Sequence, residues 1–265
     1  MRTYALILGV SSGFGRASAI ELARGGLNIF GVHLDRKSGL EEVEKIKNTI
    51  ESLGVMACFF NVNAADAEKR GYVVSEIQRL AGSEDKSSTL KVFLHSLAFG
   101  TLKPLISKEP TKVVSKTQLE MTLDVMANSM VYWVQDLFNA GLLKQGCQVY
   151  AMTSAGGSKV WPTYGPVSAA KSALESYVRQ LAYELAPHSI SVNAILAGVT
   201  KTPALEKIPS AKEMLKTALE RSQSNRLTTP EDIAHFIATL ALSPIDNPWL
   251  TGNIINVDGG ENLST

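Results

Sequence analysis

Cysteine is scarce in this sequence, and long apolar runs are missing. The two cysteines, Cys58 and Cys147, lie in apolar stretches with the character of strands. They predict reduced thiols in a core, because neither a disulfide framework nor metal-ligand spacing is present, and no metal is expected. No apolar run reaches the roughly 18 residues that a transmembrane helix needs. We therefore expect a cytoplasmic protein that is not inserted in a membrane.

A charge excess of either sign is also missing. The 26 Lys and Arg side chains nearly balance the 25 Asp and Glu side chains, which leaves a net charge of +1. Nothing global therefore indicates a nucleic-acid partner. The N-terminal residues MRTYALILG enter an apolar strand at once, without the pattern of a signal peptide.

What the sequence does contain is a regular alternation of short apolar runs and amphipathic stretches. Strands are predicted at 4–8, 28–34, 55–60, 91–95, 147–153, 190–195 and 254–257. Helices are predicted after residue 15 and at 39–53, 66–82, 117–142, 164–186 and 230–242, with a polar loop at 83–88. This alternation predicts an α/β fold: one Rossmann-like domain over 1–265, with a doubly wound parallel sheet of about seven strands and helices on both faces. Residues 197–228 form an insertion within that domain.

A glycine-rich turn follows the first predicted strand. It reads GVSSGFG at 9–15 and leads directly into a helical pattern. Such a turn lets the backbone approach a pyrophosphate, which the free N–H groups and the dipole of the helix N-terminus stabilise. The alternative is a tight turn without a ligand, but the order strand, turn, helix favours a nucleotide.

In such folds, residues at the end of the second strand bind the adenosine ribose. An acidic residue there favours NAD, and the corresponding place falls near His33. Arg36 and Lys37 follow closely and would suit a 2′-phosphate, unless they are only part of a solvated turn. Asp35 is within reach of the same ribose, so the sequence favours NADPH only slightly over NADH.

Three groups suited to hydride-transfer chemistry lie within residues 154–171. Ser154 offers a hydroxyl, Tyr164 a phenol and Lys171 an ammonium group. Seven residues are close to two helical turns, so a helix would place Tyr164 and Lys171 on one face. A lysine close to a phenol would favour the phenolate. The alternative is an ordinary helix with a surface lysine, and a plain serine at the end of a strand.

Together these motifs resemble the short-chain dehydrogenase/reductase family over nearly the whole chain. The 9–15 turn resembles its cofactor turn, Asn61-Val62 its adenine-side pair, residues 196–202 its loop over the nicotinamide and pyrophosphate, and residues 251–260 its C-terminal strand.

The departures from that family are more specific. Most members have Tyr-x3-Lys, whereas Val167 occupies the tyrosine position here and Tyr164 lies one turn earlier. This Tyr-x6-Lys spacing resembles the enoyl-acyl-carrier-protein reductases. The sequence His95-Ser96-Leu97-Ala98 and the acidic Asp124 agree with that group, and Ser154 takes the place where many of its members have a second tyrosine.

The resemblance implies NAD(P)H-dependent reduction of a trans-2-enoyl thioester. Hydride would go to the β carbon rather than to a carbonyl carbon, so the oxygen that gains charge would lie further from the carbon that receives hydride. A tyrosine moved by one helical turn, about 5.4 Å, would suit a hydrogen bond to that oxygen. The implied catalytic residues are Tyr164, Lys171 and Ser154. The implied substrate contacts are Phe99, Tyr164 and Leu205. The implied cofactor-binding residues are Gly9, Ser11, Ser12, Gly13, Phe14, Gly15, His33, Arg36, Asn61, Val62, Ser96, Leu97, Ala98, Lys171, Gly198, Val199, Thr200 and Thr202.

Further expectations concern partners. The insertion carries an excess of basic residues, which would attract an acidic acyl carrier protein or would simply form a solvated helix face. These residues are Lys201, Lys207, Lys212, Lys216, Arg221 and Arg226. The resemblance also implies a homotetramer, with which Met126, Met130, Trp133 and Tyr177 are compatible.

Asp124 and His95 are expected to serve packing or hydrogen bonding. Two other functions stay open: a ketone or alcohol dehydrogenase, and a non-catalytic nucleotide sensor of the same fold.

Overall fold

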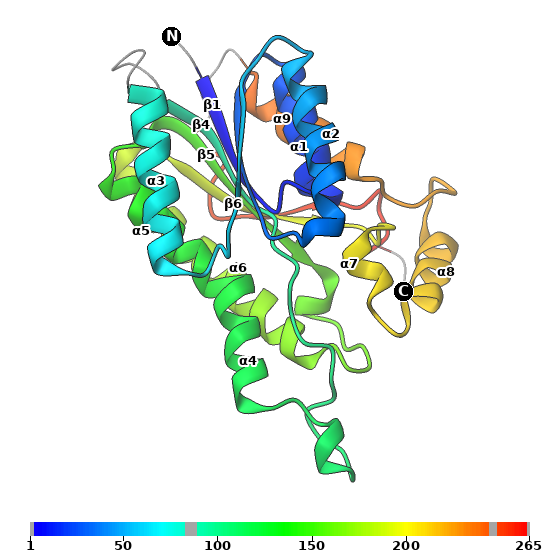
Figure 1. Cartoon of the computed structure of the whole chain (residues 1–265). Coiled ribbons are helices and arrows are strands. Elements are labelled where there is room, and N and C mark those ends of the chain that lie inside the picture. Colours follow the sequence, from blue (N-terminus) through cyan, green and yellow to red (C-terminus); the bar gives the residue numbers. More distant parts are fainter. Residues whose placement is uncertain (1–2, 83–88, 244–247, 264–265) are drawn as a thin grey trace.

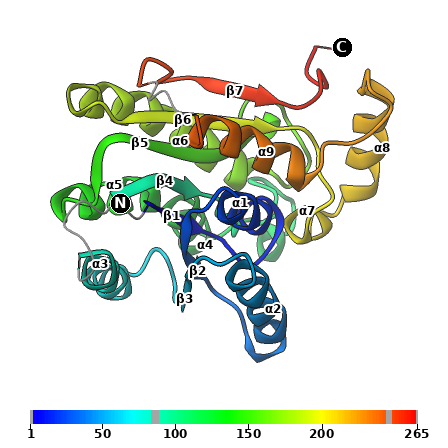
Figure 2. The same cartoon turned by 90° about the horizontal axis from the view of Figure 1, so that it is seen from above.

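The computed structural model describes residues 3–82, 89–243 and 248–263. Seven parallel strands form one sheet in the order β3-β2-β1-β4-β5-β6-β7 (Figures 1 and 2). They are β1 (Thr3–Leu8), β2 (Asn28–His33), β3 (Ala57–Asn61), β4 (Thr89–His95), β5 (Leu143–Ser154), β6 (Ser191–Ala197) and β7 (Ile254–Val257). The predicted α/β fold class is confirmed.

Helices cover both faces of the sheet (Figure 2). Helices α3 (Ala67–Gly82), α5 (Ser129–Asn139) and α6 (Gly165–Leu185) enclose one apolar core, and α4 (Lys116–Leu123) packs beside α6. Helices α1 (Gly13–Arg24), α2 (Leu40–Glu51) and α9 (Pro230–Ala241) enclose the other core. Because both faces are buried, β1, β2 and β4 carry almost continuous apolar residues instead of an alternating pattern.

The chain reverses its direction of travel across the sheet between β1 and β4, which are neighbours. In open α/β sheets, ligands bind outside the carboxyl ends of the strands at such a switch point. Leu8, the last residue of β1, pairs with His95, the last residue of β4. The segments that follow these two strands are therefore brought together, and the same edge receives the ends of β5 and β6.

Several predicted boundaries differ from the structure. The single helix predicted at 117–142 is α4, a π-helical turn η3 (Asp124–Asn128) and α5, and it ends at Asn139. Gly141, with φ of 68°, supplies the left-handed residue that follows the helix, and β5 then begins at Leu143 instead of residue 147. Strand β3 begins at Ala57, two residues later than predicted. The polar loop predicted at 83–88 lies outside the described residues.

The 197–228 insertion contains α7 (Pro203–Glu206) and α8 (Ala211–Arg221), which Figure 1 shows beside the carboxyl ends of the strands. Its apolar residues form a separate cluster, made of Leu205, Ile208, Ala211 and Met214 packed against Trp161 and Tyr164. The insertion therefore covers the 154–171 segment.

Within the described residues, no helix combines the length and apolar character needed to span a bilayer.

The residues that were compatible with a tetramer interface are mostly inside the chain. Met126, Met130 and Trp133 have exposed fractions of 2%, 0% and 0%. They pack beneath β4 and β5 in the first core, so they cannot form an interface between subunits. Tyr177 is partly buried and donates a hydrogen bond from its hydroxyl to Asn128 Oδ1 at 3.0 Å.

Trp133 holds the first core to the loop after β3, because its indole N–H donates to the carbonyl oxygen of Ala64 at 2.8 Å. We expect Trp133→Ala to lower the free energy of unfolding by about 3–5 kcal/mol, since it creates a cavity and leaves a buried carbonyl unpaired. Chemical denaturation measures this change. Trp249, which is 93% exposed, is the matched control, and Trp249→Ala should change the stability by less than about 0.5 kcal/mol.

Candidate active site

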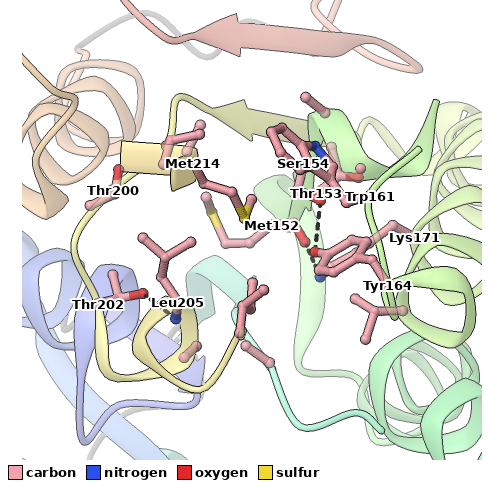
Figure 3. A pocket seen from close by; sticks show the side chains of 18 of the residues that line it. Met152, Thr153, Ser154, Trp161, Tyr164, Lys171, Thr200, Thr202, Leu205 and Met214 are labelled. Carbon is pink, nitrogen blue, oxygen red and sulfur yellow. Dashed lines mark hydrogen bonds between the residues drawn. The ribbon is translucent and has the colours of Figure 1, made fainter. Parts of the chain in front are cut away.

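One cavity opens at the carboxyl edge of the sheet, where four strands end. Its walls come from the segments after β1, β4, β5 and β6, together with α7 and α8 (Figure 3). Predicted site residues that line it are Phe14, Ser96, Leu97, Ala98, Ser154, Tyr164, Lys171, Gly198, Val199, Thr200, Thr202 and Leu205. The topology thus brings together residues that lie as far apart as positions 14 and 205.

Tyr164 and Ser154 meet inside this cavity. The Tyr164 hydroxyl and Ser154 Oγ lie 3.2 Å apart and share a hydrogen bond (Figure 3). The Tyr164 ring lies over Gly156, where an added Cβ would approach Tyr164 Cε1 to 2.3 Å. A glycine at this position therefore makes room for the phenol. The segment folds this way because β5 ends at Ser154 and α6 begins at Gly165, with Tyr164 as its N-cap residue.

Lys171 lines the same cavity and is almost fully buried, with an exposed fraction of 5%. Its ammonium group donates to the carbonyl oxygen of Met152 at 2.6 Å, which ties α6 to the end of β5. Burial lowers the pKa of Lys171 to about 8, although the nearby Glu175 carboxylate acts in the opposite direction. Glu175 accepts a hydrogen bond from Thr153 Oγ1 at 2.6 Å, so it is itself fixed.

The structure does not support the predicted phenolate at Tyr164. Burial raises the pKa of Tyr164 above its usual value, and the hydrogen bond with Ser154 opposes this rise only in part. The lysine directs its ammonium group at Met152 rather than at the phenol. Tyr164 is consequently a protonated phenol, which suits a hydrogen-bond donor to an oxygen that gains charge.

The 9–15 turn has the form of a phosphate cradle. An added Cβ would meet Ser96 O at 2.4 Å from Gly9, and Gly9 O at 2.1 Å from Gly15, so the backbone packs too closely for any other residue type. Gly13 has a φ of 51° and begins α1. Ser12, the N-cap residue, forms no side-chain capping bond, which leaves the first N–H groups of α1 to a ligand. The residues present therefore fit a dinucleotide.

The adenosine side of the cradle differs in part from the prediction. His33 is 6% exposed, and its Nδ1 lies 3.0 Å from Asp35 Oδ2, so this ring is engaged with Asp35. Asn61 and Asp35 exchange two hydrogen bonds of 3.0 Å, which join the loops after β2 and β3. Arg36 is exposed, whereas Val62 packs against the first core. Sequence reasoning placed these groups correctly near one another but did not foresee the His33–Asp35 contact.

The end of β4 and the chain after it include one prediction that the structure confirms and one that it does not. His95 is fully buried, with Nε2 at 2.8 Å from Ser129 Oγ, and burial together with the Lys171 charge lowers its pKa to about 3. Packing or hydrogen bonding was expected of this histidine. Phe99, which was predicted to contact the substrate, is 58% exposed and does not line the cavity. Asp124 accepts a hydrogen bond from Tyr132 at 3.1 Å and also lies outside the cavity lining.

Several lining residues were missed. Met126, Met152, Trp161, Ile208 and Met214 give the cavity an apolar wall, and Figure 3 shows Met152, Trp161 and Met214 pointing into it. Apolar spacing in the insertion was a usable signal for Ile208 and Met214, whereas Met126 was read as core. Glu261 also lines the cavity; burial raises the pKa of its carboxyl, although the Val199 N–H opposes the rise. No pattern in the sequence pointed to Glu261.

The class of protein follows from the sheet order, the glycine cradle and the Tyr–Lys pair at one edge: it is a short-chain dehydrogenase/reductase with a nicotinamide cofactor. Residues 9–262 match the family described as Enoyl-(Acyl carrier protein) reductase, and the chain belongs to this family.

Relatives and solved structures agree with this assignment. The enoyl-[acyl-carrier-protein] reductase [NADH] FabI of Buchnera aphidicola is 33% identical over 176 residues, which are 66% of each chain. The 1-cyclohexenylcarbonyl-CoA reductase of Streptomyces collinus is 26% identical over 98% of this chain and 86% of its own. The crystal structure of FabI from Candidatus Liberibacter asiaticus superposes with a TM-score of 0.82, at 26% identity, over 100% of this chain and 96% of the other.

The pKa of Lys171 predicts a pH dependence of cofactor binding. Below about pH 8 the side chain is an ammonium group, and above that value it loses its charge and one donor. We therefore expect the affinity for the reduced cofactor to fall as the pH rises through about 8. Cofactor fluorescence titrations between about pH 7 and 9 measure this. The inflection should disappear in Lys171→Met and persist in Lys216→Met, an exposed control; an affinity independent of pH in the unaltered protein would contradict the prediction.

Proposed function

We propose that this protein reduces the carbon–carbon double bond of a trans-2-enoyl thioester. The observation that carries the proposal is the half-buried, protonated phenol of Tyr164, which lines the cavity one helical turn before the usual position. At the usual position the buried Val167 lines the cavity and has no proton to give. A ketone reductase needs its acid beside the oxygen that is bonded to the carbon receiving hydride. An enoyl reductase needs a donor at the thioester oxygen, two atoms further away.

The roles of the residues follow from their positions. A reduced nicotinamide held in the cradle would supply the hydride for Cβ, and the π electrons of the enoyl thioester would then move onto the thioester oxygen. Tyr164 donates a hydrogen bond to that oxygen as it becomes an enolate, an interaction that strengthens in the transition state. Ser154 orients the phenol through its hydrogen bond. Lys171 holds the nicotinamide ribose hydroxyls, and water delivers the proton to Cα.

The apolar wall suits an acyl chain, which the insertion covers as a lid. Of the basic residues in the insertion, Lys207 and Arg221 line the cavity. We therefore assign Lys207 and Arg221 to the mouth, where they would attract the phosphate of a thioester carrier or an acidic acyl carrier protein.

The direct test follows the absorbance of NADPH, and separately of NADH, after addition of crotonyl-coenzyme A, a longer enoyl thioester or its acyl-carrier-protein ester. A β-ketoacyl thioester is the comparison substrate. Oxidation of the cofactor with the enoyl substrates alone supports enoyl reduction. Oxidation with the keto substrate alone would make the protein a ketoreductase with an unusual acid, and cofactor binding without any turnover would favour a nucleotide sensor.

Tyr164→Phe isolates the phenol. We expect kcat with an enoyl thioester to fall by about 10²–10³, because one oxyanion donor is removed, while cofactor affinity changes little. Tyr132→Phe serves as the control, since that hydroxyl bonds Asp124 away from the cavity. Unchanged turnover in Tyr164→Phe would remove the phenol from the mechanism.

We further propose a preference for NADPH over NADH. Asp35 is engaged by His33, whereas Arg36 is exposed and forms no ion pair within the part of the chain that the structure describes. A guanidinium group in that position would pair with a 2′-phosphate. Arg36→Ala should raise the KM for NADPH about tenfold and leave the KM for NADH unchanged, with Lys45→Ala as a surface control. Equal values of both KM in the unaltered protein would contradict the preference.

A further inference from the structure

The chain returns to the cavity after β7, in a turn formed by residues 258–262. Asp258 organises this turn, because its carboxylate accepts from the N–H groups of Gly260 at 3.0 Å and Asn262 at 3.1 Å, and from Asn262 Nδ2 at 2.6 Å. Gly259 and Gly260 have φ of 61° and 85°, conformations that other residues rarely adopt. The next two side chains, Glu261 and Asn262, are thereby held in fixed directions.

These two side chains contact two different loops at the cavity. Glu261 Oε2 accepts a hydrogen bond of 2.8 Å from the backbone N–H of Val199, in the loop after β6. Asn262 Oδ1 accepts one of 2.7 Å from Lys159 Nζ, in the loop after β5. Val199, Lys159 and Glu261 all line the cavity. The 258–262 turn thus connects the loop after β6, which carries Thr200, with the loop after β5, which follows Ser154.

The loop after β6 is shaped to accept this carboxylate. A Cβ added at Gly198 would lie 2.8 Å from Glu261 Oε2, 2.3 Å from Thr228 Oγ1 and 3.2 Å from Asp258 Cα. Only glycine therefore allows the turn and the loop to approach this closely. The same loop is fixed further along by Thr200 Oγ1, which donates to Gly198 O at 2.9 Å, and by the Thr202 cap of α7.

We propose that Glu261 is a positioning residue, whose hydrogen bond to Val199 holds the loop after β6 in the conformation that covers the nicotinamide cofactor. Asn262 anchors the same turn to the loop after β5 through Lys159. The inference rests on the cofactor site of the proposed function, but not on the identity of the substrate. A loop ordered in advance costs less entropy when the cofactor binds. Loss of the bond should therefore weaken cofactor binding more than it slows the chemical step.

The central test compares Glu261→Gln with Glu261→Ala. Glutamine keeps an oxygen acceptor for the Val199 N–H, whereas alanine removes it. We expect Glu261→Ala to raise the Kd and KM for the reduced cofactor about tenfold with kcat changed less than about twofold, and Glu261→Gln to stay near the unaltered protein. Leu263→Ala, at an 86% exposed position beside the turn, is the control. Equal losses in both Glu261 variants, or no loss in Glu261→Ala, would overturn the proposal.

The contact between Lys159 and Asn262 is tested separately, because a Glu261 variant that fails to fold would not show whether Glu261 positions the loop after β6. Lys159→Met leaves the 258–262 turn intact and should raise the cofactor Kd about threefold. Its effect should vanish in the Glu261→Ala background, since both contacts act through one turn. Effects that simply add would show that Lys159 contacts the ligand directly. They would overturn the proposal that Asn262 anchors the turn through Lys159.

Binding is measured by fluorescence of the reduced cofactor without any thioester, alongside the melting temperature of each variant. The result therefore stands whether or not enoyl thioesters are reduced. A failure of enoyl reduction with an intact Glu261 effect would reject only the proposed substrate.

Discussion

The hydrogen bond from Lys171 to the carbonyl oxygen of Met152 is the contact on which the site depends. It joins α6 to the end of β5 within the wall of the cavity, and it gives a buried ammonium group a fixed partner. An unpaired buried charge would cost far more than this bond contributes, so the helix cannot slide along the strand without a large penalty. The positions of Tyr164 and Ser154 follow from that fixed register, because both flank the same junction.

The parallel sheet provides the second constraint. Strand ends from distant parts of the chain meet at one edge, so each loop needs to supply only one or two groups. The glycine cradle, the Tyr–Lys pair and the loop after β6 are therefore separate in sequence but share a cavity. The insertion adds an apolar cover without disturbing the sheet, since α7 and α8 pack mainly on one another and on Trp161.

Sequence reasoning succeeded where a local pattern determines a local structure. Continuous apolar runs located all seven strands, and the glycine turn located the cradle, because strand periodicity and glycine conformations are short-range properties. It failed where a side chain is oriented by distant neighbours. The expectation of a phenolate at Tyr164 assumed that the ammonium group of Lys171 faces the phenol. That group instead donates a hydrogen bond to the carbonyl oxygen of Met152. Phe99 and Glu261 show the same limit, since nothing nearby in the sequence decides whether they face the cavity.

The close contact between Gly156 and the Tyr164 ring has a consequence for how such a site arises. A side chain at position 156 and a phenol at position 164 exclude each other, because an added Cβ would overlap the ring. A phenol in this place therefore requires a residue without a side chain at position 156. Transplanting the tyrosine alone into a protein with a larger residue at this position would displace the ring.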